Sequence, residues 1–301
     1  MILAIETATP VCSVALGLDN GRVVEKRIEG RGVHSERTFT FIQELLERYN
    51  LSVDDLSVVL FSNGPGSYTG LRIGAAAIKG LLFRREIPLY TLCTLTSYAV
   101  PFLDRVPVVI HSVIDARREH LYYRKSEIRS VGQGGNSDPT DADIMKMEKT
   151  VQSGEPDETD TENKKPENID QTGETIQSDI ESKKPEKGVQ PGETVHSDPE
   201  IKNQLKEGQT VEILQSSAEV AEIKKLEKEI QPGEIVAGTG WERISHSKRE
   251  KIEWSGSERI SATNLIHAWN NELLKPLFKK EDVEQFEPDY LTMSQLNNSS
   301  I

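Results

Sequence analysis

The sequence predicts an α/β fold with a mixed sheet, on three observations. Short apolar runs of strand length occur at residues 2–5, 12–18 and 57–61. Apolar side chains then recur at helical spacing in residues 35–49, and a second helix, rich in Gly and Ala, is expected at residues 68–84. Strands and helices continue to alternate after this point, which is typical of a sheet covered by helices.

The elements of the first half follow from local signals. The turn sequence Asp19–Gly21 joins the strand at 12–18 to a polar strand at 22–28. Ser35 is a suitable cap for the helix that ends near Tyr49. Three strands before the first helix are the layout of ribonuclease-H-like folds. Further strands are expected at residues 57–61, 89–92, 108–114 and 120–123, and further helices at residues 68–84 and 96–102.

The second half resumes with weaker signals. Ser216 and Glu219 form a capping-box pattern, and aliphatic side chains at helical spacing extend the predicted helix to Ile230. A strand at 235–238 and a helix at 261–274 follow, and the chain ends in a polar tail.

A long acidic segment interrupts these elements. Residues 126–232 contain no Phe, Trp or Tyr and hold 25 of the 49 acidic residues, with 13 of the 36 basic ones. The patterns Gln152–Glu155, Gln171–Glu174 and Gln190–Glu193 recur at a spacing of 19. The segment has only a few scattered aliphatic residues in each repeat. These cannot bury enough apolar surface to offset the loss of chain entropy on folding. We expect a disordered repeat insertion at 126–211, an N-terminal lobe at 1–103 and a C-terminal lobe at 104–125 and 212–301.

Composition excludes several functional classes. The net charge is −13, and nearly all of it belongs to the insertion, so no basic excess marks the chain as an independent binder of nucleic acid. No apolar run approaches the length of a membrane span and no signal peptide is recognisable. The two cysteines, Cys12 and Cys93, are expected to be buried thiols, although a single disulfide is an alternative. These features predict a soluble, cytoplasmic protein.

Two turns in the first half could contact an anion or nucleotide. The loop Asn63–Gly70 lies between a buried strand and a helix, where free backbone amides can face an anion, and Gly64, Gly66 and Ser67 are the candidate contacts. The alternative is a tight turn that lets the helix pack closely. Glu6 and Thr7 form an acidic turn that resembles the phosphate-binding turn of actin-like ATPases, but no second acidic glycine turn follows. We therefore expect at most a vestigial site.

The sequence predicts no catalytic residues, no metal site and no cofactor. None of the six histidines pairs at the spacing of one helical turn, and His34 is expected to cap or pack at the start of the first helix. Ser67 does not lie in the nucleophile-elbow pattern.

The two early helices instead predict a surface for a partner. Small residues along the second helix leave a shallow face onto which another helix can approach, and Phe39 widens the apolar stripe of the first. The alternative is that these residues form internal core. The predicted interface residues are His34, Phe39, Phe41, Ile42, Leu45, Leu46, Tyr49, Tyr68, Thr69, Gly70, Ile73, Gly74, Ala77 and Leu81.

Several motifs together resemble the TsaB (YeaZ) family. The run Gly64-Pro-Gly-Ser-Tyr-Thr-Gly-Leu-Arg-Ile-Gly74 is highly specific for it. The other matching segments are Ile2–Thr9, Val11–Leu16, His34–Glu36, Asp115–Arg117, Gly238–Trp241 and Pro288–Leu291. The matches span everything except the insertion. Thr292 departs from the family, whose members usually have Arg after Tyr-Leu.

The resemblance implies a two-lobed ribonuclease-H-like fold of the actin/Hsp70 superfamily. It implies a non-catalytic subunit that binds the catalytic TsaD protein through its first two long helices, with the ATPase TsaE joining and a homodimer forming when TsaD is missing. This assembly transfers a threonylcarbamoyl group to N6 of the adenosine beside the anticodon in tRNAs that read ANN codons, so tRNA would be met only through the complex. The alternative is an enzyme of the same superfamily, either a glycoprotease-type metallopeptidase or a small-molecule kinase.

Overall fold

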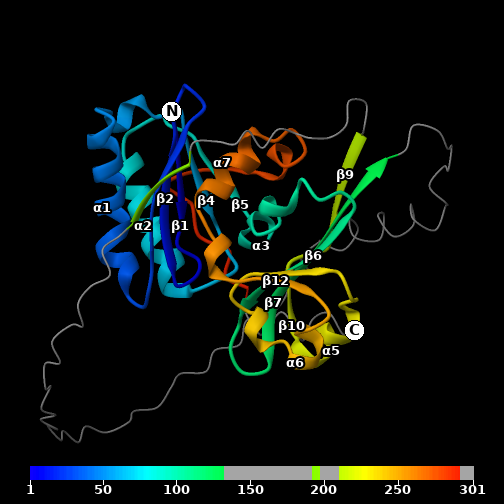
Figure 1. The fold of residues 1–301 in the computed structure, drawn as a ribbon. Helices are drawn as coiled ribbons and strands as arrows, with labels where there is room; N and C mark the ends of the chain where they lie inside the picture. Colours follow the sequence, from blue (N-terminus) through cyan, green and yellow to red (C-terminus); the bar gives the residue numbers. More distant parts are fainter. Residues whose placement is uncertain (132–191, 197–209, 292–301) are drawn as a thin grey trace, which may run out of the picture. The chain divides into compact units, whose positions relative to one another are not determined.

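The computed structural model describes residues 1–131, 192–196 and 210–291, which form two β-sheets with helices (Figure 1). Most of the predicted disordered insertion lies outside the described residues. The first residues of the predicted insertion, 126–131, belong to a strand, because the strand that begins at His120 continues to Val131 and pairs with residues 210–215. Residues 192–196 form a further strand.

The first sheet contains seven strands in the order β13-β5-β4-β1-β2-β3-β8. Strands β1, β2 and β3 form an antiparallel meander, and β4 and β5 join β1 in parallel. Strands β8 and β13 add antiparallel edges. The strand bounds are β1 Ile2–Glu6, β2 Val11–Gly17, β3 Val23–Glu29, β4 Val58–Ser62, β5 Leu89–Leu92, β8 Gly192–His196 and β13 Lys279–Glu281.

Helices cover both faces of this sheet. Helices α1 (Val33–Arg48) and α2 (Tyr68–Leu82) share a core with one face, and α7 (Thr263–Asn270) packs on the other (Figure 1). Helix α1 begins at Val33 after Gly32, whose φ of 75° is left-handed, so Ser35 lies inside the helix and is not its cap. The helix predicted at 96–102 is two short pieces, α3 (Thr94–Ser97) and a 3-10 turn at Val100–Phe102.

The second sheet repeats the strand pattern of the first. Strand β6 pairs antiparallel with β7 and parallel with β11, and β12 follows β11 in parallel. Strands β9 and β10 pair with β7. The bounds are β6 Val108–Asp115, β7 His120–Val131, β9 Thr210–Gln215, β10 Glu219–Glu222, β11 Ile235–Ala237 and β12 Glu253–Ser255. Short helices α5 (Ile223–Glu229) and α6 (His246–Arg249) complete this lobe.

Two sequence predictions are wrong in this half. The capping box at Ser216 does not start a helix, because Glu219–Glu222 is a strand paired with β7 and the helix begins only at Ile223. The predicted C-terminal lobe also reached too far: β13 pairs with β5, and α7 packs on the first sheet. Residues 263–281 therefore belong to the first lobe. No helix in the described part of the chain has the length and apolar character needed to cross a bilayer.

Candidate functional site

The glycine-rich loop before α2 is built for close packing against the turn between β1 and β2. A Cβ atom added at Gly66 would collide with the carbonyl oxygen of Ala8, and one at Gly70 with that of Thr7. At Gly74 it would lie 2.5 Å from Thr7 Oγ1 and 2.6 Å from Phe61 Cε2. Only glycine lets the helix approach the strand ends this closely.

Several polar groups of this loop are bonded within the protein, although Asn63 Oδ1 is buried without a partner. Ser67 N donates to Ala8 O at 2.6 Å, and the Ser67 side chain caps α2 by accepting from Gly70 N at 3.3 Å. Gly64 N donates to Thr94 Oγ1 at 3.1 Å. Gly64 has a φ of 118°, and its Cα faces the carbonyl oxygen of Asp289. These contacts support the packing interpretation of Gly64, Gly66 and Ser67 over the anion-contact one.

The acidic turn at Glu6 and Thr7 is enclosed. Both side chains are buried, and Glu6 Oε1 accepts a hydrogen bond from Ala8 N at 2.7 Å. Burial raises the pKa of Glu6 to about 7, against the opposing effects of the Ser62 hydroxyl and the Ala8 amide. Glu6 Oε2 and Thr7 Oγ1 have no hydrogen-bond partner. Because both side chains are buried, the turn cannot contact a nucleotide in this conformation. Its carboxyl group, on Glu6, is only partly ionised near neutral pH.

Tyr98 closes the region next to this turn. Its ring lies against the backbone of Gly238 in the second lobe, where an added Cβ would be 2.8 Å away. Burial raises the pKa of the Tyr98 hydroxyl well above its ordinary value, and the charge of Glu6 raises it further. Tyr98 therefore connects the acidic turn of the first lobe with the Gly238–Trp241 motif of the second.

The structure places most of the predicted partner-binding residues inside the monomer, which corrects the sequence interpretation of the helix pair. They line the core between the helices and the first sheet, because the same apolar stripe that could receive a partner is already covered by the strands. The buried members of the predicted set are His34, Phe41, Ile42, Leu45, Leu46, Gly70, Gly74, Ala77 and Leu81.

His34 packs at the start of α1, as predicted. It is buried, and its Nε2 lies 3.2 Å from the carbonyl oxygen of Val11. Burial lowers the pKa of His34, and hydrogen bonds to the backbone at Val11 and Thr9 oppose that shift. The ring therefore anchors the helix to the sheet.

The outer side of the same helices exposes large apolar side chains. Phe39 on α1 is 51% exposed, Tyr68 at the start of α2 is 58% exposed, and Phe83 just after α2 is 67% exposed. Thr69 is also exposed, whereas Tyr49 and Ile73 are half-buried. A Cβ added at Gly80, which is exposed on α2, would lie 3.7 Å from Phe39 Cζ. We call Phe39, Tyr68, Ile73, Gly80 and Phe83 the outer face.

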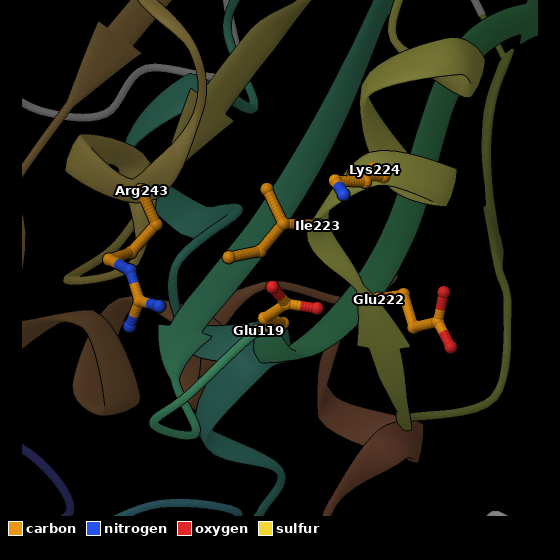
Figure 2. A pocket seen from close by; sticks show the side chains of 5 residues that line it. All are labelled: Glu119, Glu222, Ile223, Lys224 and Arg243. Carbon is orange, nitrogen blue, oxygen red and sulfur yellow. The ribbon is translucent and has the colours of Figure 1, made fainter.

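A hollow in the second lobe was not predicted. It has a volume of about 150 Å³ and is lined by Glu119, Glu222, Ile223, Lys224 and Arg243. Figure 2 shows that these side chains come from the β6–β7 turn, the β10–α5 junction and the segment after Trp241. Arg243 Nη1 donates to Asp115 Oδ1 at 2.6 Å, so this region is a charged turn held by an ion pair. In the part of the chain that the structure describes, no group of three His, Cys, Asp or Glu residues is placed to hold a metal ion.

Both sheets share one strand pattern, three antiparallel strands extended by parallel strands. In the first sheet, an acidic turn follows β1. This arrangement defines a two-lobed protein of the ribonuclease-H-like, actin-related class. Two solved structures support the fold: YeaZ from Pseudomonas aeruginosa, with a TM-score of 0.57 and 18% identity over 96% of this chain and 99% of that one, and a protein described as similar to peptidase YEAZ from the same organism, with a TM-score of 0.54.

Sequence comparison gives the family. A model described as "TsaD: tRNA N6-adenosine threonylcarbamoyltransferase" matches residues 31–183, about half of the chain. Proteins named "tRNA threonylcarbamoyladenosine biosynthesis protein TsaB" are 32% identical in Haemophilus influenzae and 33% identical in Escherichia coli, each over 123 residues or 40% of this chain. The chain spans about half the length of these relatives, 52% and 53%. It belongs to the TsaD family, among its TsaB (YeaZ) members.

Proposed function

We propose that this protein is a non-catalytic scaffold subunit in tRNA threonylcarbamoyladenosine biosynthesis, and that it binds and activates a catalytic TsaD protein through its outer face. The relatives named TsaB, each of which aligns with 123 residues of this chain, support the pathway. The observation that supports the mode of action is the exposure of Phe39, Tyr68 and Phe83 on helices whose other sides are core.

Three large aromatic side chains are exposed to water along one helix pair, Tyr68 and Phe83 at opposite ends of α2, and exposed apolar surface of this kind can mark an interaction site. Burying aromatic side chains dominates the energetics of many protein interfaces. Gly80 is exposed beside Phe39, so α2 carries no side chain of its own at this point and a helix of the partner can approach close enough to contact Phe39. A second copy of this chain could use the same surface when TsaD is absent.

Activation would then be structural. The scaffold subunit contributes no reacting group in this proposal; it holds the catalytic protein in the conformation that transfers the threonylcarbamoyl group to tRNA, with TsaE as a further partner. The enclosed Glu6 turn is in keeping with this division of labour.

The test is a binding assay between purified protein and the TsaD protein of the same organism. Phe39→Asp and Phe83→Asp place a charge in the patch and should weaken binding about tenfold or more. Leu273→Asp is the matched control, because Leu273 is 39% exposed and lies outside both helices. Normal binding by both patch variants would show that the outer face is not the interface.

A second measurement addresses the pathway. A strain depleted of this protein should lose threonylcarbamoyladenosine from its tRNA, and the wild-type gene should restore it while Phe39→Asp does not. Unchanged tRNA nucleosides in the depleted strain would contradict the proposed function itself.

A further inference from the structure

The second lobe carries a stack of two tryptophans. The rings of Trp241 and Trp254 lie 3.8 Å apart between centroids, at an interplanar angle of 4°. The guanidinium carbon of Arg249 lies 5.4 Å from the centroid of the Trp241 ring. Three flat groups with delocalised electrons are thus gathered in one cluster.

One member of this stack remains open to water. Trp254 is 48% exposed, although tryptophan is costly to leave in solvent. It lies in the middle of β12, which ends the second sheet in the described part of the chain. Trp241 covers one ring face of Trp254, so the face turned away from Trp241 is the one available to a ligand.

Core packing alone does not account for this arrangement. Trp241 already packs against the cluster around Val113 and Val236, and Val236, the register partner of Trp254, is fully buried. A second indole stacked on the outside adds little burial to that core. It does add a flat, rigid surface at the spacing at which aromatic rings stack.

We propose that the Trp241–Trp254 stack, supported by Arg249, is a site on which an unpaired base of tRNA stacks. This inference rests on the proposed function, because that function makes tRNA the substrate of the assembly. Unpaired bases are recognised in RNA-binding proteins by stacking on aromatic side chains and arginine planes, and every base offers a ring face for it.

The surrounding charge favours a nucleic acid over a second apolar surface. Lys251 is exposed three residues before Trp254, and Arg105 reaches β12 through an ion pair with Glu253 at 2.5 Å. Arg105 and Glu253 offset each other's charge, so the positive charge beside the stack comes from Arg249 and Lys251. The chain as a whole is acidic, with a net charge of −13, so the contact is expected to add to the affinity of a tRNA that the complex already holds.

The first experiment uses the full chain alone at low salt with a short single-stranded RNA oligonucleotide. Stacking should quench the fluorescence of Trp254, and Trp254→Ala should abolish the quenching. Trp269→Phe is the matched control: Trp269 packs against Tyr90 and Phe278 in the first lobe, so its loss should leave the quenching in place. Equal quenching in the wild type and in Trp254→Ala would overturn the proposal.

The second experiment uses the complex with the TsaD protein and an unmodified tRNA transcript. Trp254→Ala should weaken tRNA binding roughly 5- to 150-fold, the range of one stacked base. Trp254→Phe should retain most of the affinity and Trp254→Leu should not, because a ring face and not apolar bulk is required. Melting temperatures of all variants establish that they are folded.

The outcomes separate this proposal from the proposed function. If the wild-type chain fails to bind the TsaD protein, the scaffold role fails, while the oligonucleotide titration still reports on the stack. If Trp254→Ala weakens binding of the TsaD protein and leaves tRNA binding unchanged, the stack is a protein-docking surface and the proposal is wrong.

Discussion

The inner and outer sides of the α1–α2 pair differ in the substitutions that they can accept without loss of the fold. The inner side is closed: Phe41, Ile42 and Leu45 lie in the core, and Gly70 and Gly74 press α2 onto the β1–β2 turn. The outer side exposes Phe39 and Phe83 and has room at Gly80. One helix pair can therefore contribute to folding through one side and, as we propose, to association through the other. Substitutions on the inner side should lower the stability of the protein, whereas substitutions on the outer side should weaken partner binding.

The largest effect is expected at Ile42. Ile42→Asp buries a charge without a partner, which should cost about 4–5 kcal/mol or more and leave little folded protein. Phe39→Asp, three residues away on the outer side, should change the free energy of unfolding by only about 0.5 kcal/mol. Urea denaturation of both variants measures this contrast. Similar stabilities would mean that the two sides are not distinct.

The next effect concerns the turn beneath α2 and its dependence on pH. The folded-state pKa of Glu6 is about 7, raised from an ordinary value of 4.5, so the folded protein binds a proton more tightly than the unfolded chain does. This contribution to stability is fully present below pH 4.5 and is lost as the pH rises through 7.

Between those limits the loss should amount to about 3 kcal/mol. Glu6→Gln cannot titrate and should remove this part of the pH dependence. Unfolding free energies of the two proteins measured from pH 4.5 to pH 8 provide the test. Parallel curves for the wild type and the variant would show that Glu6 is not held protonated.

The smallest effects come from two glycines on opposite sides of α2. Gly74→Ala brings a methyl group against Thr7 and Phe61 and should destabilise the protein by about 1–3 kcal/mol. Gly80→Ala meets only an ordinary contact with Phe39 and should stabilise the helix by about 0.5–1 kcal/mol. Thermal unfolding of the pair measures the difference in sign. If both changes were stabilising, the close approach at Gly74 would be refuted.

Much of the first lobe could be predicted from sequence because its signals are local. The strand runs, the helix periods and the turn at Asp19–Gly21 each act within a few residues, and the motif residues gave the family. It was harder to predict which side of each helix faces the sheet. Phe39 and Phe41 were both assigned to one widened stripe, but only Phe41 faces the sheet, since two residues along a helix differ by about 200° in direction.

The spacing of the glycines in α2 also did not determine which surface they contact. Gly70 and Gly74 lie one turn apart and share a face, yet their spacing does not say whether that face meets a partner or the protein's own β1–β2 turn. The strand at Glu219–Glu222 was missed because it forms only by pairing with β7, whose own length was underestimated. Contacts between distant segments decided each of these cases.

The return of the chain to the first lobe has a consequence for how the protein is made. Asp289 N bonds to Asn63 O at 2.7 Å, Phe286 packs edge-on against Phe61, and β13 completes the sheet beside β5. Residues 1–92 therefore leave the ribosome long before the segment that finishes their domain. During that interval the nascent lobe should need protection from aggregation, and neither lobe should be obtainable by cutting the gene at a single point.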